Sequence, residues 1–305
     1  MKPVIETHAL CKSYHGRPVV DHLNLTVPEG CVYGFLGPNG AGKSTTMKML
    51  LGLVHPTGGS VELLGHTLNE ANRIVPLRQT GSLIESPSGY LHLTARENLS
   101  IVADLKDVDR KDISRVLEIV HLTKDADRKV GQYSLGMKQR LGIAMALLGS
   151  PKLLILDEPT NGLDPAGIQE MRSLIASMPQ TTGATVLISS HLLGEIEQMV
   201  TQVGILNHGK VLLERSLSDL QDNTVKLQVA YQGVTEPPLP AELNILHRSH
   251  VGRVYTYIVR GSSQEIMRRM QITEPVLLES IPLTLEEIFI YELGGEDYAI
   301  RDIVL

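Results

Sequence analysis

The chain has 305 residues, of which 42% are hydrophobic and 20% are charged, as is ordinary for a globular protein. A formal net charge of −6 disfavours nonspecific binding to nucleic acid, and an aromatic content of 4% without Trp argues against a surface that stacks on bases or sugars. The amino terminus lacks the apolar core of a signal peptide, and the most apolar stretch, 143–156, is too interrupted to cross a bilayer. We therefore expect a protein that is soluble on its own and meets a membrane only through a partner.

Short strands are predicted first, over 4–9 and 23–27, where apolar and polar residues alternate. A nearly continuous apolar run over 31–36 is typical of a strand that is buried on both faces of a sheet. A Gly-rich turn separates this run from a helix predicted over 43–51. The order is therefore strand, loop and helix.

Helices and buried strands then alternate, with helical segments at 95–127, 135–148 and 165–178 and strands at 152–156 and 184–189. In the first of these segments Leu99, Val102 and Leu105 recur at helical spacing. Alternation of strands and helices implies a parallel sheet with crossover connections. We find no internal repeat, which indicates one such unit in the chain.

A different pattern begins near residue 222. It predicts strands at 225–231, 254–259 and 276–281, a turn-rich connector at 235–240, a helix at 264–270, and a last helix capped by Thr284 with Leu285, Ile288 and Phe289 on one face. These elements make a small α/β domain. Its role as a packing cap and its role as a regulatory domain stay equally open.

The two cysteines, Cys11 and Cys31, fit no metal-ligand spacing. We expect both to be buried free thiols in a reducing compartment.

The pattern G-x-x-x-x-G-K-[ST] occurs between the buried strand and the helix. Its glycines let successive backbone N–H groups point at phosphate oxygens, and the following helix adds its positive end. Lys43 supplies a charge near the β- and γ-phosphates, and the Ser44 hydroxyl suits Mg²⁺. The predicted ATP-binding residues here are Gly37, Pro38, Asn39, Gly40, Ala41, Gly42, Lys43, Ser44 and Thr45.

An apolar strand over 153–156 ends in the carboxylates Asp157 and Glu158. Ligands bind at the carboxyl ends of strands in sheets of this kind. We expect Asp157 to hold Mg²⁺, directly or through water, and Glu158 to act as the base that polarises the attacking water.

At this point the chain resembles the ATP-binding subunits of ABC transporters. The phosphate loop looks like a Walker A motif and 153–158 like a Walker B motif, while 133–140 resembles the ABC signature and 161–165 the D-loop. His191 stands where the family has its switch histidine. These motifs occur in family order over roughly residues 1 to 220.

The resemblance implies further roles. Tyr14 would stack on adenine, His191 would sense the γ-phosphate as a catalytic residue, and Asp164 would link two sites across a dimer. The signature of one subunit would close over ATP held by the other, through Ser134, Leu135, Gly136 and Met137.

Two departures from the family pattern stand out. Leu135 and Met137 replace the usual second Gly and the Gln of the signature, and Glu85 stands near the expected Q-loop glutamine. Glu85 is predicted to bind Mg²⁺; without the ion, its charge beside Asp157 and Glu158 should hold one proton to higher pH. The segments 81–99 and 133–137 are similar to the bacitracin-resistance and lantibiotic-immunity branch.

The resemblance implies a P-loop NTPase fold of the α/β class: a mostly parallel core sheet, antiparallel N-terminal strands, a helical signature subdomain at about 86–150, and the small C-terminal domain. The predicted domains are 1–220, an ABC ATPase, and 221–305, accessory or regulatory. The predicted cofactors are ATP and Mg²⁺, and the predicted location is the cytoplasmic face of the plasma membrane.

The predicted partners are a separate transmembrane permease and a second ATPase subunit, the same or a related chain, with no nucleic acid. The cargo would be a peptide antibiotic, with another drug or a lipid as the alternative. A DNA-repair or condensation ATPase is disfavoured because the stretch between Lys43 and the signature has no sustained heptads for long coiled coils. A translation factor of the ABC type needs two nucleotide-binding units, and a kinase-like P-loop enzyme would have no signature.

Overall fold

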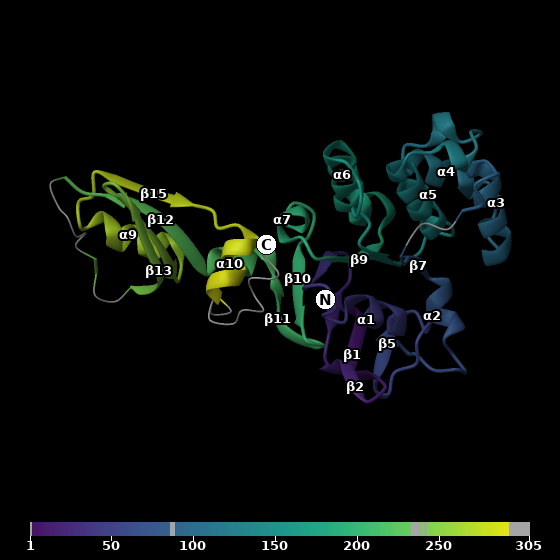
Figure 1. Cartoon of the computed structure of the whole chain (residues 1–305), viewed down its shortest axis with the longest axis horizontal. Coiled ribbons are helices and arrows are strands. Elements are labelled where there is room, and N and C mark those ends of the chain that lie inside the picture. Colours follow the sequence, from purple (N-terminus) through teal and green to yellow (C-terminus); the bar gives the residue numbers. More distant parts are fainter. Residues whose placement is uncertain (1, 86–88, 233–238, 241–242, 293–305) are drawn as a thin grey trace. The chain divides into compact units, whose positions relative to one another are not determined.

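The computed structural model describes residues 2–85, 89–232, 239–240 and 243–292 (Figure 1). The chain divides into two compact units, Met1–Glu214 and Arg215–Leu305. Each unit is described by itself.

The core of the first unit is a six-stranded sheet with the strand order β11, β10, β4, β9, β8, β7. These strands are Lys210–Ser216, Gln202–Asn207, Val32–Leu36, Thr185–Ser190, Leu153–Asp157 and Thr80–Leu83. The pairs from β10 to β7 are all parallel. Every residue of β4 and β8 is buried, because helices cover both faces of a parallel sheet, and this burial explains their continuous apolar sequences.

A second, antiparallel sheet holds the N-terminal strands β1 (Pro3–Tyr14), β2 (Arg17–Leu23), β3 (Thr26–Pro28), β5 (Gly58–Leu63) and β6 (His66–Thr67). The single strand predicted over 23–27 is wrong, because β2 ends at Leu23 and β3 begins at Thr26. Between them the Asn24 side chain, not its backbone, accepts a hydrogen bond from Ala9 N at 2.8 Å. A side-chain contact of this kind competes with the ladder and ends the strand.

Helices surround the core sheet. They are α1 (Lys43–Leu50), α2 (Ile74–Arg78), α3 (Ala95–Lys106), α4 (Asp112–Ile119), α5 (Leu135–Leu147), α6 (Pro165–Thr182) and α7 (Leu193–Ile196), with 3-10 turns at Thr123–Asp125 and Val130–Gln132. Helices α3, α4 and α5 pack on one another as a group (Figure 1). Leu105, which shares helical spacing with Leu99, is 82% exposed at the end of α3. Among the described residues, none of the helices combines the length and apolar composition that crossing a bilayer requires.

The helices of this unit begin in different ways. Helix α3 starts with a capping box, in which Thr94 accepts from Glu97 N and the Glu97 carboxylate accepts from Thr94 N. Helix α6 starts at Pro165 after its N-cap, Asp164, and continues past Pro179, beyond the predicted end at residue 178. Helix α1 follows Gly42, which has no side chain to cap it.

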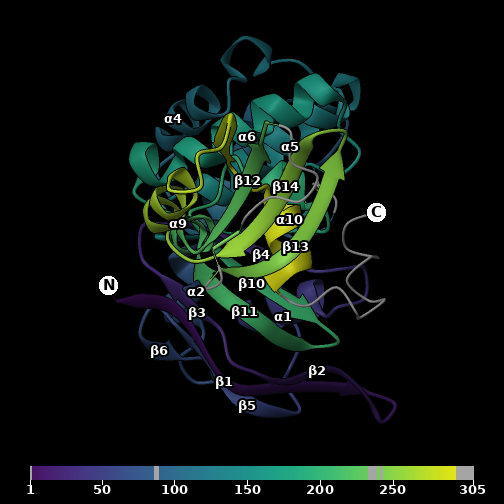
Figure 2. The same ribbon diagram turned by 90° about the vertical axis from the view of Figure 1, so that its left-hand side faces the viewer.

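The second unit contains an antiparallel sheet with the order β13 (Asn244–Val251), β14 (Val254–Arg260), β12 (Thr224–Ala230), β15 (Leu277–Ile281). Strands β13, β14 and β12 are labelled in Figure 2. Helices α8 (Leu217–Asp222), α9 (Ser263–Gln271) and α10 (Leu285–Glu292) complete it. Thr284 caps α10 as predicted, accepting from Glu287 N at 3.2 Å. Strand β13 was not predicted, and most of the connector expected at 235–240 lies outside the described residues.

Candidate functional site

The phosphate loop connects β4 to α1, and its backbone is possible only for glycine at two key positions. At Gly42, φ is 107°, and an added Cβ would lie 2.7 Å from Val19 O. At Gly37 an added Cβ would lie 2.2 Å from Leu206 O. Helix α1 then starts with no side-chain cap and no acidic residue in its first turn. Its first N–H groups are therefore left for an anion.

Lys43 lies inside this loop. Its Nζ donates hydrogen bonds to the carbonyl oxygens of Gly37, at 2.6 Å, and Pro38, at 3.1 Å. Burial lowers the pKa of Lys43, while the carboxylates of Glu158 and Asp157 raise it. A buried ammonium held by two carbonyls gains from a phosphate partner, since the phosphate would supply the negative charge that the loop lacks.

The carboxyl end of β8 carries Asp157 and Glu158, as predicted. Strand β9 pairs Ser189 with Asp157, and the Ser189 hydroxyl donates to Asp157 Oδ1 at 2.5 Å while it accepts from Glu158 N at 2.9 Å. Glu158 has a left-handed backbone, with φ at 46°, directly after the buried strand. One serine therefore holds both the side chain of the first carboxylate and the backbone of the second.

The Glu158 carboxylate meets three nitrogen groups. Its Oε1 lies 3.1 Å from His191 Nδ1 and 3.9 Å from Lys43 Nζ, and its Oε2 accepts from Asn161 Nδ2 at 3.4 Å. The Glu158 side chain is 24% exposed. A carboxylate that is oriented by these groups and still reached by solvent is suited to holding a water and accepting its proton.

A pocket of about 480 Å³ opens beside these groups. It is lined by Asn39, Ser44, Glu85, Leu135, Gln139, Asp157, Glu158 and Asn161. The pocket therefore brings together residues of the phosphate loop, the two carboxylates at the end of β8, Glu85, and residues of the signature segment. Ser44 is exposed and Thr45 is half-buried at the start of α1.

Glu85 lies at this pocket but is already paired. Its Oε1 is 2.6 Å from Lys48 Nζ, and its side chain is 68% exposed. The hydrogen bond from Lys48 lowers the pKa of Glu85. The extra proton predicted for the cluster of three carboxylates is therefore not on Glu85, because the Lys48 ammonium favours the charged form of that carboxylate.

The signature and D-loop residues cap helices. Ser134 is the N-cap of α5 and accepts from Met137 N at 3.2 Å, which leaves the N–H groups of Leu135 and Gly136 in the first turn. Asp164 is the N-cap of α6 and accepts from Gly167 N at 3.2 Å. The proposed contacts of these residues with a second subunit stay predictions.

Tyr14 stands at the end of β1, on the hairpin that leads into β2. Its ring is 43% exposed and has the Lys12 ammonium 5.0 Å from its centroid. Tyr14 is not among the described residues that line the pocket, so its adenine-stacking role also stays a prediction.

Four residues of the site were missed in the sequence: Ser189, Lys48, Asn161 and Gln139. Ser189 had a usable signal, since a polar residue that ends a buried strand must find a partner. Gln139 is buried and its Oε1 lacks a partner among the described residues, on the pocket side of α5. Lys48 lies one helical turn after Ser44, but nothing in the sequence tied it to Glu85.

Comparison with known proteins identifies the family. The ABC transporter family matches residues 20–161. The bacitracin transport ATP-binding protein BcrA of Bacillus licheniformis is 43% identical over 306 residues, covering 97% of this chain and 99% of that protein. The chain belongs to the ABC transporter family.

Other relatives agree with this assignment. The lantibiotic transport ATP-binding protein SrtF of Streptococcus pyogenes is 46% identical, covering 70% of this chain and 90% of that protein. A solved ATP-binding subunit of an ABC transporter has a TM-score of 0.63 at 30% identity, covering 72% of this chain and 92% of its own. A dimeric ATP-binding cassette bound to ADP and Pi has a TM-score of 0.63 at 25% identity, covering 70% and 98%.

The predictions of fold class and of enzyme class are therefore confirmed. The chain is an ABC ATPase subunit that binds and hydrolyses ATP, with the predicted mostly parallel core sheet and antiparallel N-terminal strands.

Proposed function

We propose that this ABC ATPase binds ATP with Mg²⁺ at the pocket between the phosphate loop and the end of β8. The observation that carries the assignment is the convergence of Lys43, Asp157, Glu158 and His191 from three separate segments. The loop amides and Lys43 would hold the phosphates, and Tyr14 would stack on the adenine.

The residues present fit a magnesium ion. Ser44 is exposed at the start of α1, Asp157 is a buried carboxylate with one oxygen on Ser189, and both line the same pocket. Oxygen ligands of this kind suit Mg²⁺, which when bound neutralises charge on the phosphates. Glu85 is the third candidate ligand, and its pair with Lys48 would have to open.

Hydrolysis itself would depend on Glu158. Its carboxylate would orient a water and accept a proton from it, while Lys43 stabilises the charge that develops on the phosphoryl oxygens. His191, 3.1 Å from Glu158, would keep that carboxylate in place and contact the γ-phosphate. Both roles are electrostatic and positional, which is the usual form of catalysis in phosphoryl transfer.

We further propose that two such subunits, identical or related, close around two ATP molecules and drive a separate permease at the inner face of the plasma membrane. Ser134 and the Gly136 amide would then meet the partner's nucleotide, and Asp164 would face the partner. The residues at 1–220 would form the ATPase domain and those at 221–305 an accessory or regulatory domain. The net charge of −6 supports a partner other than nucleic acid.

The cargo is proposed to be a peptide antibiotic of the bacitracin or lantibiotic type, and the support is the likeness to BcrA over nearly the whole chain. Another drug or a lipid is the alternative. An ATPase subunit contacts its permease and not the cargo, so resistance in cells is the direct test.

The test uses a sensitive bacterial strain that carries this chain together with the permease that co-purifies with it. We expect the inhibitory concentration of bacitracin or of a lantibiotic to rise, and that of a drug of unrelated chemistry to stay unchanged. The Lys43→Ala chain, expressed at the same level, is the matched control and should give no protection. Protection against the unrelated drug alone would overturn the peptide assignment and favour the alternative.

A further inference from the structure

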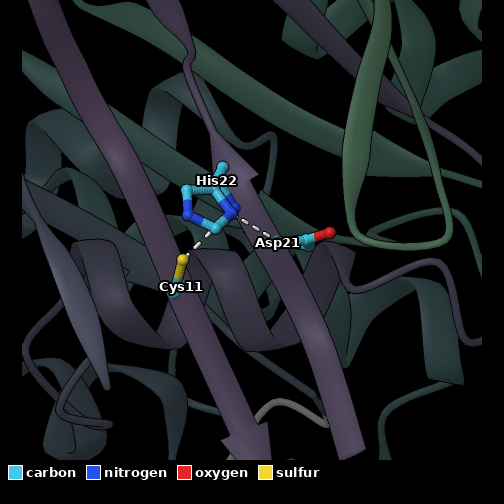
Figure 3. Close-up of side chains that lie close together, drawn as sticks. All are labelled: Cys11, Asp21 and His22. Carbon is cyan, nitrogen blue, oxygen red and sulfur yellow. Dashed lines mark hydrogen bonds and ion pairs between the residues drawn. The ribbon is translucent and has the colours of Figure 1, made fainter.

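Three potential metal ligands meet on the β1–β2 hairpin (Figure 3), and none of them is among the residues that line the catalytic pocket. One ligand atom from each of Cys11, Asp21 and His22 lies within 4.8 Å of the other two. Cys11 and Asp21 are half-buried, and His22 is exposed. The sequence-based expectation of a buried thiol is therefore wrong for Cys11, although it holds for Cys31.

A β-bulge creates this cluster. The register pairs Leu10 with Leu23 and then Lys12 with Val20, so Asp21 and His22 together oppose Cys11. In a regular strand two consecutive side chains point to opposite faces of the sheet. The bulge redirects one of them, and the His22 side chain lies between Cys11 and Asp21 (Figure 3).

The bulge also holds His22 in a strained conformation. Its φ is 48°, a left-handed value that costs a residue other than glycine about 1–3 kcal/mol. The surrounding sheet must hold this backbone in place, since an isolated strand would relax it. Strain of this kind gathers at ligand-binding positions.

Polar contacts link the three side chains to one another and link Asp21 to Lys210. His22 N donates to Cys11 Sγ at 3.3 Å, and His22 Nδ1 lies 2.6 Å from Asp21 Oδ1. Lys210, on β11, pairs with the other carboxylate oxygen, Asp21 Oδ2, at 3.1 Å. Hydrogen bonds from His22 and Lys210 lower the pKa of Asp21.

We propose that Cys11, Asp21 and His22 form a Zn²⁺ site, with Cys11 Sγ, a His22 ring nitrogen and Asp21 Oδ1 as ligands and water in the fourth position. A sulfur, a nitrogen and an oxygen suit this borderline-soft ion, whereas Mg²⁺ takes oxygen ligands. Zn–S bonds of about 2.3 Å and Zn–N bonds of about 2.0–2.1 Å would require ligand atoms that now lie within 4.8 Å of one another to come to less than about 4.5 Å apart. Binding replaces the thiol proton, which passes to solvent.

The ion would fix the hairpin that carries Tyr14. Cys11 and Tyr14 are on the same strand, and β2 returns directly after the turn that follows Tyr14. A bound zinc would link the two strands at the bulge, where the ladder is interrupted. This inference stands apart from the proposed transport function, since it needs neither the permease nor the cargo.

The test is a Zn²⁺ titration of the full-length, reduced, metal-stripped protein against a chromophoric chelator, without nucleotide. We expect one ion per chain, and a loss of affinity of at least about 100-fold in Cys11→Ser and in His22→Asn, above the range typical of residues outside the ligand shell. Asp21→Asn should weaken binding less. The matched controls are Cys31→Ala and His15→Asn, which should bind zinc like the parent.

Two further measurements identify the sulfur ligand and use the parent protein. Co²⁺ in place of Zn²⁺ should give a thiolate charge-transfer band. Zn²⁺ should also slow alkylation of Cys11, followed by mass spectrometry at pH 8. Cys31 is the internal reference, because burial raises its pKa to about 11 and leaves it almost un-ionised there.

The proposal is overturned if the parent binds no zinc at micromolar concentration, or if Cys11→Ser binds it as tightly as the parent does. It is also overturned if alkylation of Cys11 is unchanged by the ion. Circular dichroism establishes whether each variant is folded. If Cys11→Ser does not fold, the alkylation result on the parent decides.

Discussion

Strand β8 of the first unit and strand β12 of the second both contribute buried apolar residues to a sheet, but they differ in pattern and in pairing. Strand β8 is buried throughout, lies between parallel neighbours and ends in Asp157 and Glu158. Strand β12 alternates along most of its length and pairs antiparallel on both sides. Parallel strands place all their carboxyl ends at one edge, so polar residues from β8 and β9 meet there. Antiparallel neighbours place those ends at opposite edges, and no such gathering follows.

The largest expected effect is at that edge. Glu158→Gln keeps the shape of the side chain and removes the base, so hydrolysis should fall by about 10²–10⁴-fold while ATP still binds. Phosphate release measures the rate, and sedimentation with ATP and Mg²⁺ should show an accumulated dimer. Glu170→Gln, on the exposed side of α6, is the matched control. Near-normal turnover in the Glu158→Gln protein would remove the residue from its assigned role.

Core substitutions in the two units should affect stability and hydrolysis differently. Leu227→Ala in β12 removes a fully buried side chain, and should lower the free energy of unfolding of the second unit by about 2–5 kcal/mol while hydrolysis persists. Leu154→Ala in β8 should cost a similar amount and also reduce hydrolysis, because it shifts the strand that carries the carboxylates. Thermal unfolding and phosphate release, measured on both variants, check this. Equal loss of hydrolysis in the two proteins would show that the units do not act separately.

A smaller effect is expected at Ser189, the residue that joins β9 to the end of β8. Ser189→Ala leaves Glu158 N and Asp157 Oδ1 without this partner. The loss should raise the activation free energy of hydrolysis by about 1–3 kcal/mol, which corresponds to a kcat that is roughly 5–150-fold lower. The KM for ATP should change little, because the phosphate loop is untouched. Ser177→Ala, on α6, serves as the control. A rise in KM with an unchanged kcat would contradict a positioning role.

The smallest effect is expected at Glu85. Glu85→Gln breaks an exposed pair with Lys48, so the apparent Mg²⁺ affinity should fall by no more than about 5-fold and hydrolysis should stay measurable. The larger loss should appear as reduced antibiotic resistance in cells that carry the whole transporter. A Mg²⁺ titration of ATPase activity and the resistance assay, with Glu118→Gln beside it, test both parts. A variant equal to the parent in both assays would leave Glu85 without a special role.

Sequence alone located most of the first unit, because its buried strands and its phosphate loop have continuous or fixed patterns. The predicted bounds are within one residue of the observed ones for β4, α1, α5, β8 and β9. The break at Asn24 and the passage of α6 through Pro179 were missed, since both depend on side-chain or tertiary contacts. Strand β13 has an exposed face along most of its length, and it lacks the apolar pattern that would reveal it.

The residues of the site also fall into two groups, those that the sequence motifs predict and those that depend on tertiary contacts. Lys43, Asp157, Glu158 and His191 could be predicted because their places in the motifs are fixed, whereas the Lys48–Glu85 pair joins residues that are far apart in sequence. Cys11 was dismissed on spacing alone. A bulge changes which side chains share a face, and a register of that kind depends on strand pairing that no local pattern reports.

The uncapped start of α1 has a consequence for the protein as a whole. Helices α3 and α6 satisfy their first amides with Thr94 and Asp164, but α1 has only Gly42 at that place. A nucleotide phosphate is then the group that completes the helix, in the position a capping side chain takes elsewhere. Only the folded chain can bind the nucleotide in this way. The free energy of unfolding of the ATPase unit therefore rises with the ATP concentration, as the logarithm of the ratio of that concentration to the dissociation constant.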